Sequence, residues 1–359
     1  MVLQVYENVH CLDFSALYPN IIRQCNLSPE FNYSKKFTDG DDNLVINKSE
    51  FSNTKIGILP QLATKLIIMR KDYRSKGMEA EQLACKIAVN SMYGVLSQKT
   101  AKYILGGTNI ASTVTWVGRN ILHGLVERLP SYDIKVIYGK TDSIFVISET
   151  IKDKDEILSI GQSVASELVK ELTGFDNEYI VFDYEEFIEK MVLVNKNNYV
   201  KSYGDNRKLK GATFFNSKTS DYENDVMNFL LDKIIFENII TKEDLSKFAM
   251  DFLRSKINSK PLDYFAINHK PRLELINKFD QVNFMLDNDI NIEYGFNHRA
   301  VICDYDGNSD GVLVYPIDYD LSDYEFRVDR KWLESINKKI INKLDLKSKQ
   351  KQFTLDSWN

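Results

Sequence analysis

Two strand-like segments that carry aspartates at their ends constrain the fold of this chain most. Residues 9–14 read VHCLDF and alternate like a half-buried strand, with Asp13 on one face and Phe14 on the other. Residues 134–148 read IKVIYGKTDSIFVIS, which is two apolar runs around a polar turn and predicts a β-hairpin with Asp142 at the turn. The chain therefore presents one acid at a strand end and another at a hairpin turn.

Paired carboxylates of this kind suit two-metal phosphoryl transfer. Two carboxylates can bridge Mg²⁺ ions that lie about 3.5 to 4 Å apart, and these ions activate the attacking oxygen and stabilise the leaving one. The chemistry requires Asp13 and Asp142 to meet in the fold. Their spacing in the sequence alone does not show that they meet.

An antiparallel helical hairpin is expected between these two segments. Pro60 can sit near a helix start, and apolar residues then recur with helical spacing up to Met69. Gly77 interrupts the pattern and marks the expected tip of the hairpin. The spacing resumes after the tip through Leu83, Ile87 and Met92.

The hairpin presents a candidate phosphate clamp. At 1.5 Å per helical residue, Arg70 lies about 10 Å and Lys86 about 13 Å from the tip, so the two side chains are nearly level. Lys86, Asn90 and Tyr93 share one helix face, because they are four and three residues apart. A Lys and an Asn beside an Arg can hold a phosphate group. An ordinary solvated helix face is the alternative.

Composition excludes several classes of protein. The chain has 359 residues, of which 43% are hydrophobic and 27% charged, so it is not disordered, collagen-like or disulfide-rich. No apolar run approaches the roughly 20 residues of a membrane-spanning helix. The four cysteines lie far apart with no C-x-x-C pair, which argues against a zinc site. We expect an intracellular protein of two or more subdomains with no membrane segment.

Charge is unevenly distributed, although the net charge is only −5. Basic residues gather in 65–76, 196–210 and 338–351, and acidic residues gather in 287–329. Such a pattern suits a protein that grips a polyanion on one side. Solvated faces without a ligand are the alternative for each stretch.

Three motifs in a fixed order resemble those of a known family. Residues 13–22 read DFSALYPNII, residues 86–94 read KIAVNSMYG, and residues 138–143 read YGKTDS. They are similar to the motifs D-x-x-S-L-Y-P-S-I-I, K-x-x-x-N-S-x-Y-G and Y-G-D-T-D-S of family B DNA polymerases. The resemblance covers nearly the whole chain. Supporting matches are GILP at 57–60, KNNY at 196–199 and LKG at 209–211.

The resemblance implies roles for individual residues. Asp13 and Asp142 would be catalytic, as the ligands of two Mg²⁺ ions. Tyr18 would lie beneath the sugar of the incoming nucleotide and exclude a 2′-hydroxyl. The residues implied to contact the nucleotide are Tyr18, Arg70, Lys86, Asn90 and Tyr93, and those implied to contact DNA are Gly94, Lys196, Tyr199 and Lys210.

Several positions depart from the family pattern. Lys140 replaces the acid that usually opens D-T-D, so a positive charge stands beside the expected metal ligands. Ala16 replaces the usual Ser, and K-K-R-Y becomes K-N-N-Y at 196–199, which loses two charges and weakens the expected grip on DNA. Because of Lys140, a catalytically silent polymerase-like module that binds DNA or organises a replisome is the alternative function.

The resemblance implies an α+β right-hand fold with an antiparallel palm sheet. The expected parts are a first palm segment at 1–55, helical-hairpin fingers at 56–96, a second palm segment at 97–215, and a mainly helical thumb with a C-terminal tail at 216–359. The implied function is template-directed addition of deoxynucleotides to a primer 3′-hydroxyl. Its cofactors and substrates would be two Mg²⁺ ions, primed DNA and dNTPs.

A comparison with the family pattern also leads to expectations about partners. The chain starts twelve residues before Asp13 and offers no candidate exonuclease segment. We therefore expect the polymerase half of a split enzyme, with an N-terminal and exonuclease part on a separate chain. A stand-alone exonuclease-free polymerase or a fragment is the alternative. A compact, diverged polymerase indicates a phage or another mobile element, and a location in the host cytoplasm or nucleoid.

The C-terminal residues are similar to the peptide that binds sliding clamps. Residues 352–359 read QFTLDSWN and match Q-x-x-L-x-x-aromatic, in which Gln352, Leu355 and Trp358 would engage the apolar pocket of the clamp. Asn359 stands where a second aromatic residue is usual. A frayed tail is the alternative.

Deletion of residues 352–359 tests the clamp hypothesis. The deletion should shorten the products of primer extension only when a sliding clamp is present, because the peptide supplies a tether and no catalytic group. Product length per binding event, with and without the clamp, is the measurement. Equal loss under both conditions would contradict the hypothesis.

Overall fold

The computed structural model describes residues 5–30, 56–98, 107–195, 197–211, 219–270, 288–305, 308–321 and 323–344. The chain divides into two compact units, one spanning Asn8–Phe187 and the other comprising residues 188–344 together with residues 5–7. Lys196 and the C-terminal Gln352, Leu355 and Trp358, for which DNA and clamp contacts are predicted, lie outside the described residues.

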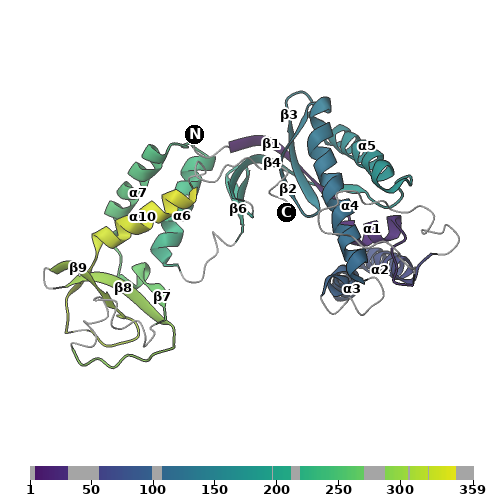
Figure 1. Ribbon diagram of the computed structural model, residues 1–359. Helices are drawn as coiled ribbons and strands as arrows, with labels where there is room; N and C mark the ends of the chain where they lie inside the picture. Colours follow the sequence, from purple (N-terminus) through teal and green to yellow (C-terminus); the bar gives the residue numbers. More distant parts are fainter. Residues whose placement is uncertain are drawn as a thin grey trace. The chain divides into compact units, whose positions relative to one another are not determined.

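The unit Asn8–Phe187 is built on a sheet whose strand order is β2-β3-β1-β4 (Figure 1). The β1–β3 and β2–β3 pairs are antiparallel. β4 continues into the other unit, where it is followed in the sheet by β5 and β6. The strands are β1 (Val5–Phe14), β2 (Ile134–Lys140), β3 (Ser143–Ser148) and β4 (Phe182–Asn195).

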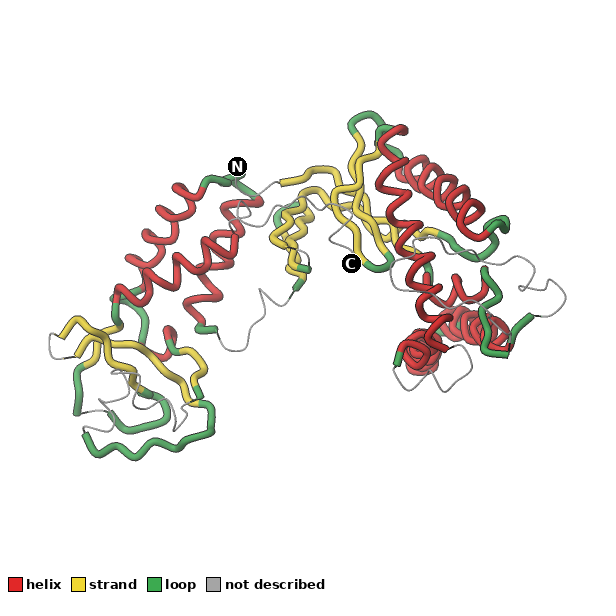
Figure 2. The backbone as a smooth tube through the Cα atoms, in the orientation of Figure 1, coloured by secondary structure: helices red, strands yellow, loops and turns green. Residues whose placement is uncertain are grey.

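Helices cover the sheet of this unit and form its core (Figure 2). Leu12 and Phe14 of β1 are fully buried with Ile121 of α4 and Val164 of α5. The strand predicted at residues 9–14 is present, but its half-buried alternation is wrong, because Val9, Cys11 and Leu12 on its two faces are all fully buried. The helices are α1 (Leu17–Gln24), α4 (Gly107–Arg128) and α5 (Lys154–Thr173), and a 3₁₀ turn, Leu129–Tyr132, follows α4.

The predicted helical hairpin is confirmed as α2 (Ile58–Ser75) and α3 (Glu79–Ser97), which pack against each other. Gly77 at the tip has a φ of 68°, a left-handed conformation that glycine adopts without steric cost.

The packed side of α3 matches the one that periodicity indicates only at Met92. Its small core is formed by Ala63, Val89 and Met92. Leu83 and Ile87 are instead 52% and 58% exposed. Apolar spacing identified the helix correctly, but it did not identify which side of α3 packs against α2.

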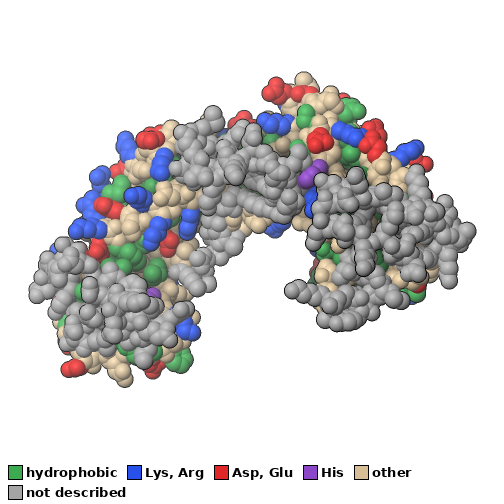
Figure 3. All heavy atoms as spheres, in the orientation of Figure 1, with side chains coloured by type: hydrophobic (Ala, Val, Ile, Leu, Met, Phe, Trp, Pro, Cys, Tyr) green, Lys and Arg blue, Asp and Glu red, His purple; other side chains and the backbone are tan. Residues whose placement is uncertain are grey.

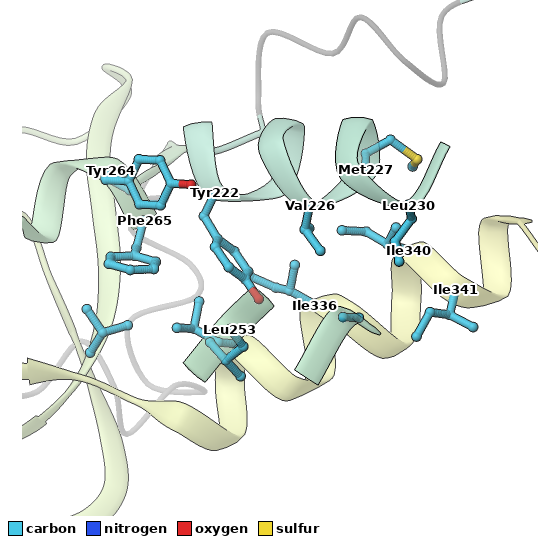
Figure 4. Packing of buried hydrophobic residues seen from close by; sticks show 14 of the residues in the cluster. Tyr222, Val226, Met227, Leu230, Leu253, Tyr264, Phe265, Ile336, Ile340 and Ile341 are labelled. Carbon is cyan, nitrogen blue, oxygen red and sulfur yellow. The ribbon is translucent and has the colours of Figure 1, made fainter. Parts of the chain in front are cut away.

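In the unit 188–344, helices build a second core. Tyr222 and Val226 of α6 pack against Leu253 of α7 and Ile336 of α10 (Figure 4). The Tyr222 hydroxyl donates to Asn337 Oδ1 at 2.8 Å, and Asn337 Nδ2 donates to the Ala249 carbonyl at 3.0 Å, so the buried polar groups are satisfied. The elements are β5 (Asn198–Tyr203), β6 (Asn206–Lys210), α6 (Asp221–Ile235), α7 (Lys242–Lys256), α8 (Leu262–Phe265) and α10 (Arg330–Leu344).

Capping residues determine where three helices begin. Asp153, Ser220 and Thr241 precede α5, α6 and α7, and each side chain accepts a hydrogen bond from a backbone N–H of the first turn. These contacts satisfy donors that have no partner within the helix, which typically contributes about 1 kcal/mol each.

A second sheet extends this unit beyond the mainly helical thumb that the sequence predicts. β8 pairs with β7, β9 and β10, and each of these pairings is antiparallel. β7 and β10 have three residues each, which is too short for a periodicity signal. The strands are β7 (Ile267–His269), β8 (His298–Tyr305), β9 (Asn308–Val314) and β10 (Phe326–Val328).

None of the helices in the described part of the chain combines the length and the apolar character that crossing a membrane requires.

Gly211 and Gly204 offer a matched test of backbone packing. Gly211 has a φ of 117°, and an added Cβ would overlap the Asn197 carbonyl and the Asn198 side chain. Gly204 has a φ of 58°, but no atom of the described residues lies within 4 Å of an added Cβ.

Gly204→Ala should cost about 1 to 2 kcal/mol of unfolding free energy through its backbone conformation alone. Gly211→Ala should cost about 3 kcal/mol or more, because the strands must also move apart. Urea denaturation measures both, and equal losses would contradict this account.

Candidate active site

β1 and β3 bring Asp13 and Asp142 side by side. Asp13, near the end of β1, lies opposite Ser143 in the antiparallel register. Asp142 lies in the turn before Ser143, and the Phe14 backbone N–H donates to the Asp142 carbonyl at 2.6 Å. Two acids far apart in the sequence therefore lie next to each other at one end of the sheet.

Several carboxylates act on Asp13. Burial, the largest cause, and the neighbouring carboxylates of Asp142, Glu185 and Asp183 raise the pKa of Asp13 to about 7. Lys86 acts in the opposite direction and lowers the pKa. Asp13 thus experiences a net negative field, in which the ammonium group of Lys86 is the opposing charge.

Asp183 and Glu185 are site residues that sequence reasoning missed. Both belong to β4, which neighbours β1 in the sheet. They are two residues apart in the sequence FDYEEF, and strand residues at this spacing share one face. That alternation of acids was the available signal.

Cys11 extends the acidic cluster. Its Sγ donates to Glu185 Oε2 at 3.0 Å. Cys11, Glu185 and Glu186 each place one metal-ligating atom within 4.8 Å of the others. This thiol lies two residues before Asp13, on the same strand.

The donor set fits Mg²⁺. Carboxylate oxygens are the hard ligands that this cation prefers. Besides burial, the largest cause, repulsion from neighbouring carboxylates raises the pKa of Asp13, and a divalent cation between them would remove that repulsion. Asp13 and Asp142 are the pair that the β1–β3 register places together, so they are the residues that would hold the metal.

Tyr18 and Tyr93 form an aromatic pair near the acids. Their ring centroids are 4.6 Å apart. Burial raises the pKa of Tyr18, and Tyr93 and Asp142 raise it further, so Tyr18 lies within electrostatic reach of the acid pair.

The turn that positions Tyr18 forms without the usual serine. Ala16 precedes α1 with φ 49° and ψ 53°, a left-handed conformation that is uncommon for a residue with a Cβ. Asn20 Nδ2 donates to the Ser15 carbonyl at 2.6 Å and so ties the turn to α1. The Ala16 side chain cannot cap α1, and the hydrogen bond from Asn20 holds the turn instead.

The polar residues of the predicted phosphate clamp lie on the two helices of the hairpin. Lys86 and Asn90 are exposed on α3, and Tyr93 of the same helix is half-buried against Tyr18. Arg70 is half-buried on α2, the partner of α3, and among the described residues it has no ion pair. Apart from the backbone of α3 itself, no atom of the described residues lies within 4 Å of a Cβ added to Gly94. Open space therefore borders this part of α3.

Lys140 is the last residue of β2 and lies opposite Ser143, with an exposed side chain. It is not among the groups that shift the pKa of Asp13. The sources of negative field that the structure shows at Asp13 are Asp142, Glu185 and Asp183.

The predicted DNA contacts of the other unit lie on a β-hairpin. Tyr199 of β5 pairs with Lys210 of β6 in the strand register. Tyr199 is only 5% exposed, whereas Lys208 and Lys210 are exposed. Arg207 forms an ion pair with Asp232 of α6 and is therefore a structural cation.

Comparisons with known proteins agree with these motifs. The family model of DNA polymerase family B matches residues 4–272. The DNA polymerase alpha catalytic subunit of Mus musculus is 26% identical over 286 residues, which is 72% of this chain and 19% of that protein. The DNA polymerase delta catalytic subunit of Candida albicans is 27% identical over 287 residues, with coverage of 70% and 27%. The DNA polymerase of guinea pig cytomegalovirus is 25% identical over 290 residues, with coverage of 68% and 25%.

A solved structure shares the fold. The family B DNA polymerase of the archaeon Pyrobaculum calidifontis matches with a TM-score of 0.63 at 20% identity, over 96% of this chain and 46% of that chain.

The chain therefore belongs to DNA polymerase family B. It spans roughly a fifth to a quarter of the length of these curated relatives.

Asp13→Asn tests the electrostatic account of the site. The folded pKa of about 7 lies above the ordinary value of 3.8, so ionisation of Asp13 costs stability as the pH rises from about 4 to about 7. In metal-free buffer at pH 8, Asp13→Asn should raise the melting temperature by a few degrees, and the gain should vanish near pH 4. Glu127→Gln, at an exposed acid of α4, is the control and should change little. A gain that persists at pH 4 would contradict the account.

Proposed function

We propose that this chain is the polymerase part of a family B DNA polymerase and adds deoxynucleotides to the 3′-hydroxyl of a primer on a DNA template. The observation that carries the proposal is the pairing of Asp13 and Asp142 at the sheet end, with Lys86 within electrostatic reach of Asp13. Relatives that are named as DNA polymerase catalytic subunits support the reaction class.

In this proposal Asp13 and Asp142 hold two Mg²⁺ ions. Bound there, the ions supply Lewis-acid activation of the primer hydroxyl and charge neutralisation at the leaving pyrophosphate. The two carboxylates come from a strand and a turn joined by a backbone hydrogen bond. Their separation is thus set by the fold before a substrate binds, which limits reorganisation during the reaction.

Arg70, Lys86 and Asn90 bind the triphosphate of the incoming nucleotide. Arg70 and Lys86 carry charges that no ion pair occupies among the described residues. Because Lys86 also lies within electrostatic reach of Asp13, it can hold a phosphate close to the acid pair against their mutual repulsion.

Tyr18 selects the deoxyribose sugar. Its ring is fixed by contact with Tyr93 and by burial, so it can act as a rigid wall beneath the sugar and exclude a 2′-hydroxyl. The space next to Gly94 admits the nascent base pair.

We assign the parts of the right-hand fold as the sequence resemblance implies. We assign the fingers to 56–96, which includes α2 and α3, the palm to 1–55 and 97–215, and the thumb to the residues from 216 onward. Lys210 and Lys196 would contact DNA phosphates, which fix the position of the duplex without reading its sequence. Tyr199 would support this hairpin from its buried position.

A sliding clamp, a separate exonuclease chain and a location in the host cytoplasm or nucleoid remain predictions of the sequence resemblance.

Lys140 favours a second candidate function, that of a silent polymerase-like module that binds DNA. We prefer the active enzyme, because Asp183 and Glu185 maintain a negative field at Asp13 to which Lys140 does not contribute. The first-position acid that Lys140 replaces is therefore not the only source of negative charge at the site.

Primer extension by the purified chain tests the proposal. With Mg²⁺ and four dNTPs, Asp142→Ala should lower the rate by about a thousandfold or more, because it removes a metal contribution of several kcal/mol. Lys140→Asp should keep the activity or raise it. Glu127→Ala, at an exposed acid of the same unit, should leave the rate unchanged.

Two outcomes would contradict the active-enzyme proposal. Extension that survives Asp142→Ala would exclude Asp142 as a metal ligand. A silent wild-type chain that Lys140→Asp activates would favour the DNA-binding module. Circular dichroism of each variant separates loss of chemistry from loss of folding.

A further inference from the structure

One segment of the chain has the opposite charge from a nucleic-acid-binding surface. Residues 287–329 contain eleven acidic residues and two basic ones, a net charge of −9. The whole chain carries −5, so the remaining residues together carry +4. The acidity of the protein is thus concentrated in this segment.

The acidic segment forms most of the second sheet and a groove beside it. β8, β9 and β10 belong to it, and the loop between β9 and β10 provides most of the groove wall. The lining residues on which the argument depends are Ile317, Asp318, Tyr324, Glu325 and Phe326.

The acids at the groove have different roles. Asp318 stabilises the fold, because its Oδ2 accepts a hydrogen bond from the Arg299 backbone N–H at 2.6 Å and lies 3.6 Å from His298 Nδ1. Asp323, in the same loop, and Glu325 are exposed, and neither has a hydrogen bond or ion pair with another described residue. These two carboxylates are available to a cationic ligand.

The groove also offers apolar surface. Ile317, between Pro316 and Asp318 in the loop, is 49% exposed. Tyr324 and Phe326 are half-buried, with ring centroids 6.0 Å apart. An aliphatic or aromatic side chain can therefore pack between the carboxylates.

Two ligand classes do not fit. The negative field of the acidic segment repels nucleic acid. Basic residues are found instead on the nearby α10, which carries five of them against Glu334. Figure 3 shows Lys and Arg side chains over the helices of this unit. A metal ion is not favoured either, because no three metal-ligating side chains described for this segment lie within 4.8 Å of one another.

We propose that this groove binds a basic segment of a partner protein, with Lys or Arg side chains that flank an aliphatic or aromatic residue. The cations pair with Asp323 and Glu325, and the apolar residue packs against Ile317. This surface is independent of the acid pair at Asp13 and does not depend on polymerase activity. The protein thus has a site for a partner protein whose negative charge repels DNA.

Charge reversal in the full chain tests the proposal. The probe is a fluorescein-labelled synthetic peptide, KKLFKKLK, and fluorescence anisotropy measures its Kd. The double variant D323K/E325K should raise the Kd at least about tenfold. The control variant E243K/D251K makes the same charge change on α7, outside the groove, and should change the Kd by less than about twofold.

Ile317→Ser separates apolar recognition from charge alone. It should weaken binding several-fold while leaving the net charge unchanged. Equal loss in D323K/E325K and E243K/D251K, or no loss in the former, would overturn the proposal. So would weaker binding of a primed-template oligonucleotide by D323K/E325K, because that result would assign the groove to DNA. Circular dichroism confirms that each variant is folded.

Discussion

The backbone hydrogen bond from Phe14 to Asp142 joins β1 to the turn before β3 and so holds two carboxylates together that would repel each other in solution. The core beneath the sheet offsets this repulsion. Leu12 and Phe14 are buried next to Asp13, and the Phe14 ring stacks on Phe182 with centroids 3.8 Å apart. Full burial of side chains of this size contributes about 1.5 to 3 kcal/mol each, enough to support a strained electrostatic arrangement. The site is thus preorganised by packing that takes no part in chemistry.

The two roles that we propose for acidic residues in this protein differ in geometry. At the end of β1, carboxylates from two strands and a turn converge, which raises the pKa of Asp13 and favours a divalent cation. In the loop between β9 and β10, Asp323 and Glu325 stand apart among apolar side chains, which favours the separate cations of a polypeptide. Convergent carboxylates suit a metal ion, whereas dispersed carboxylates suit a protein partner.

Local patterns predicted much of the fold and part of the site. The strand ending near Asp13, the turn at Asp142 and the hairpin tip at Gly77 each depend on a few neighbouring residues, and all three are present in the structure. Asp183 and Glu185 escaped prediction, because the approach of β4 to β1 is a tertiary property that no local motif encodes. The sheet of β7 to β10 was missed for a similar reason, since short strands pair across long sequence separations.

Binding of Mn²⁺, followed by electron paramagnetic resonance, is the most direct measurement of the central claim that Asp13 and Asp142 form a metal site. Titration of the wild-type chain in the presence of a dNTP should show bound Mn²⁺, and Asp142→Asn should weaken that binding at least about tenfold, since it removes a charged ligand. Glu127→Gln, far from the acid pair in the sequence and exposed on α4, should bind as the wild type does. Equal Mn²⁺ binding by the wild-type and Asp142→Asn chains would contradict the account.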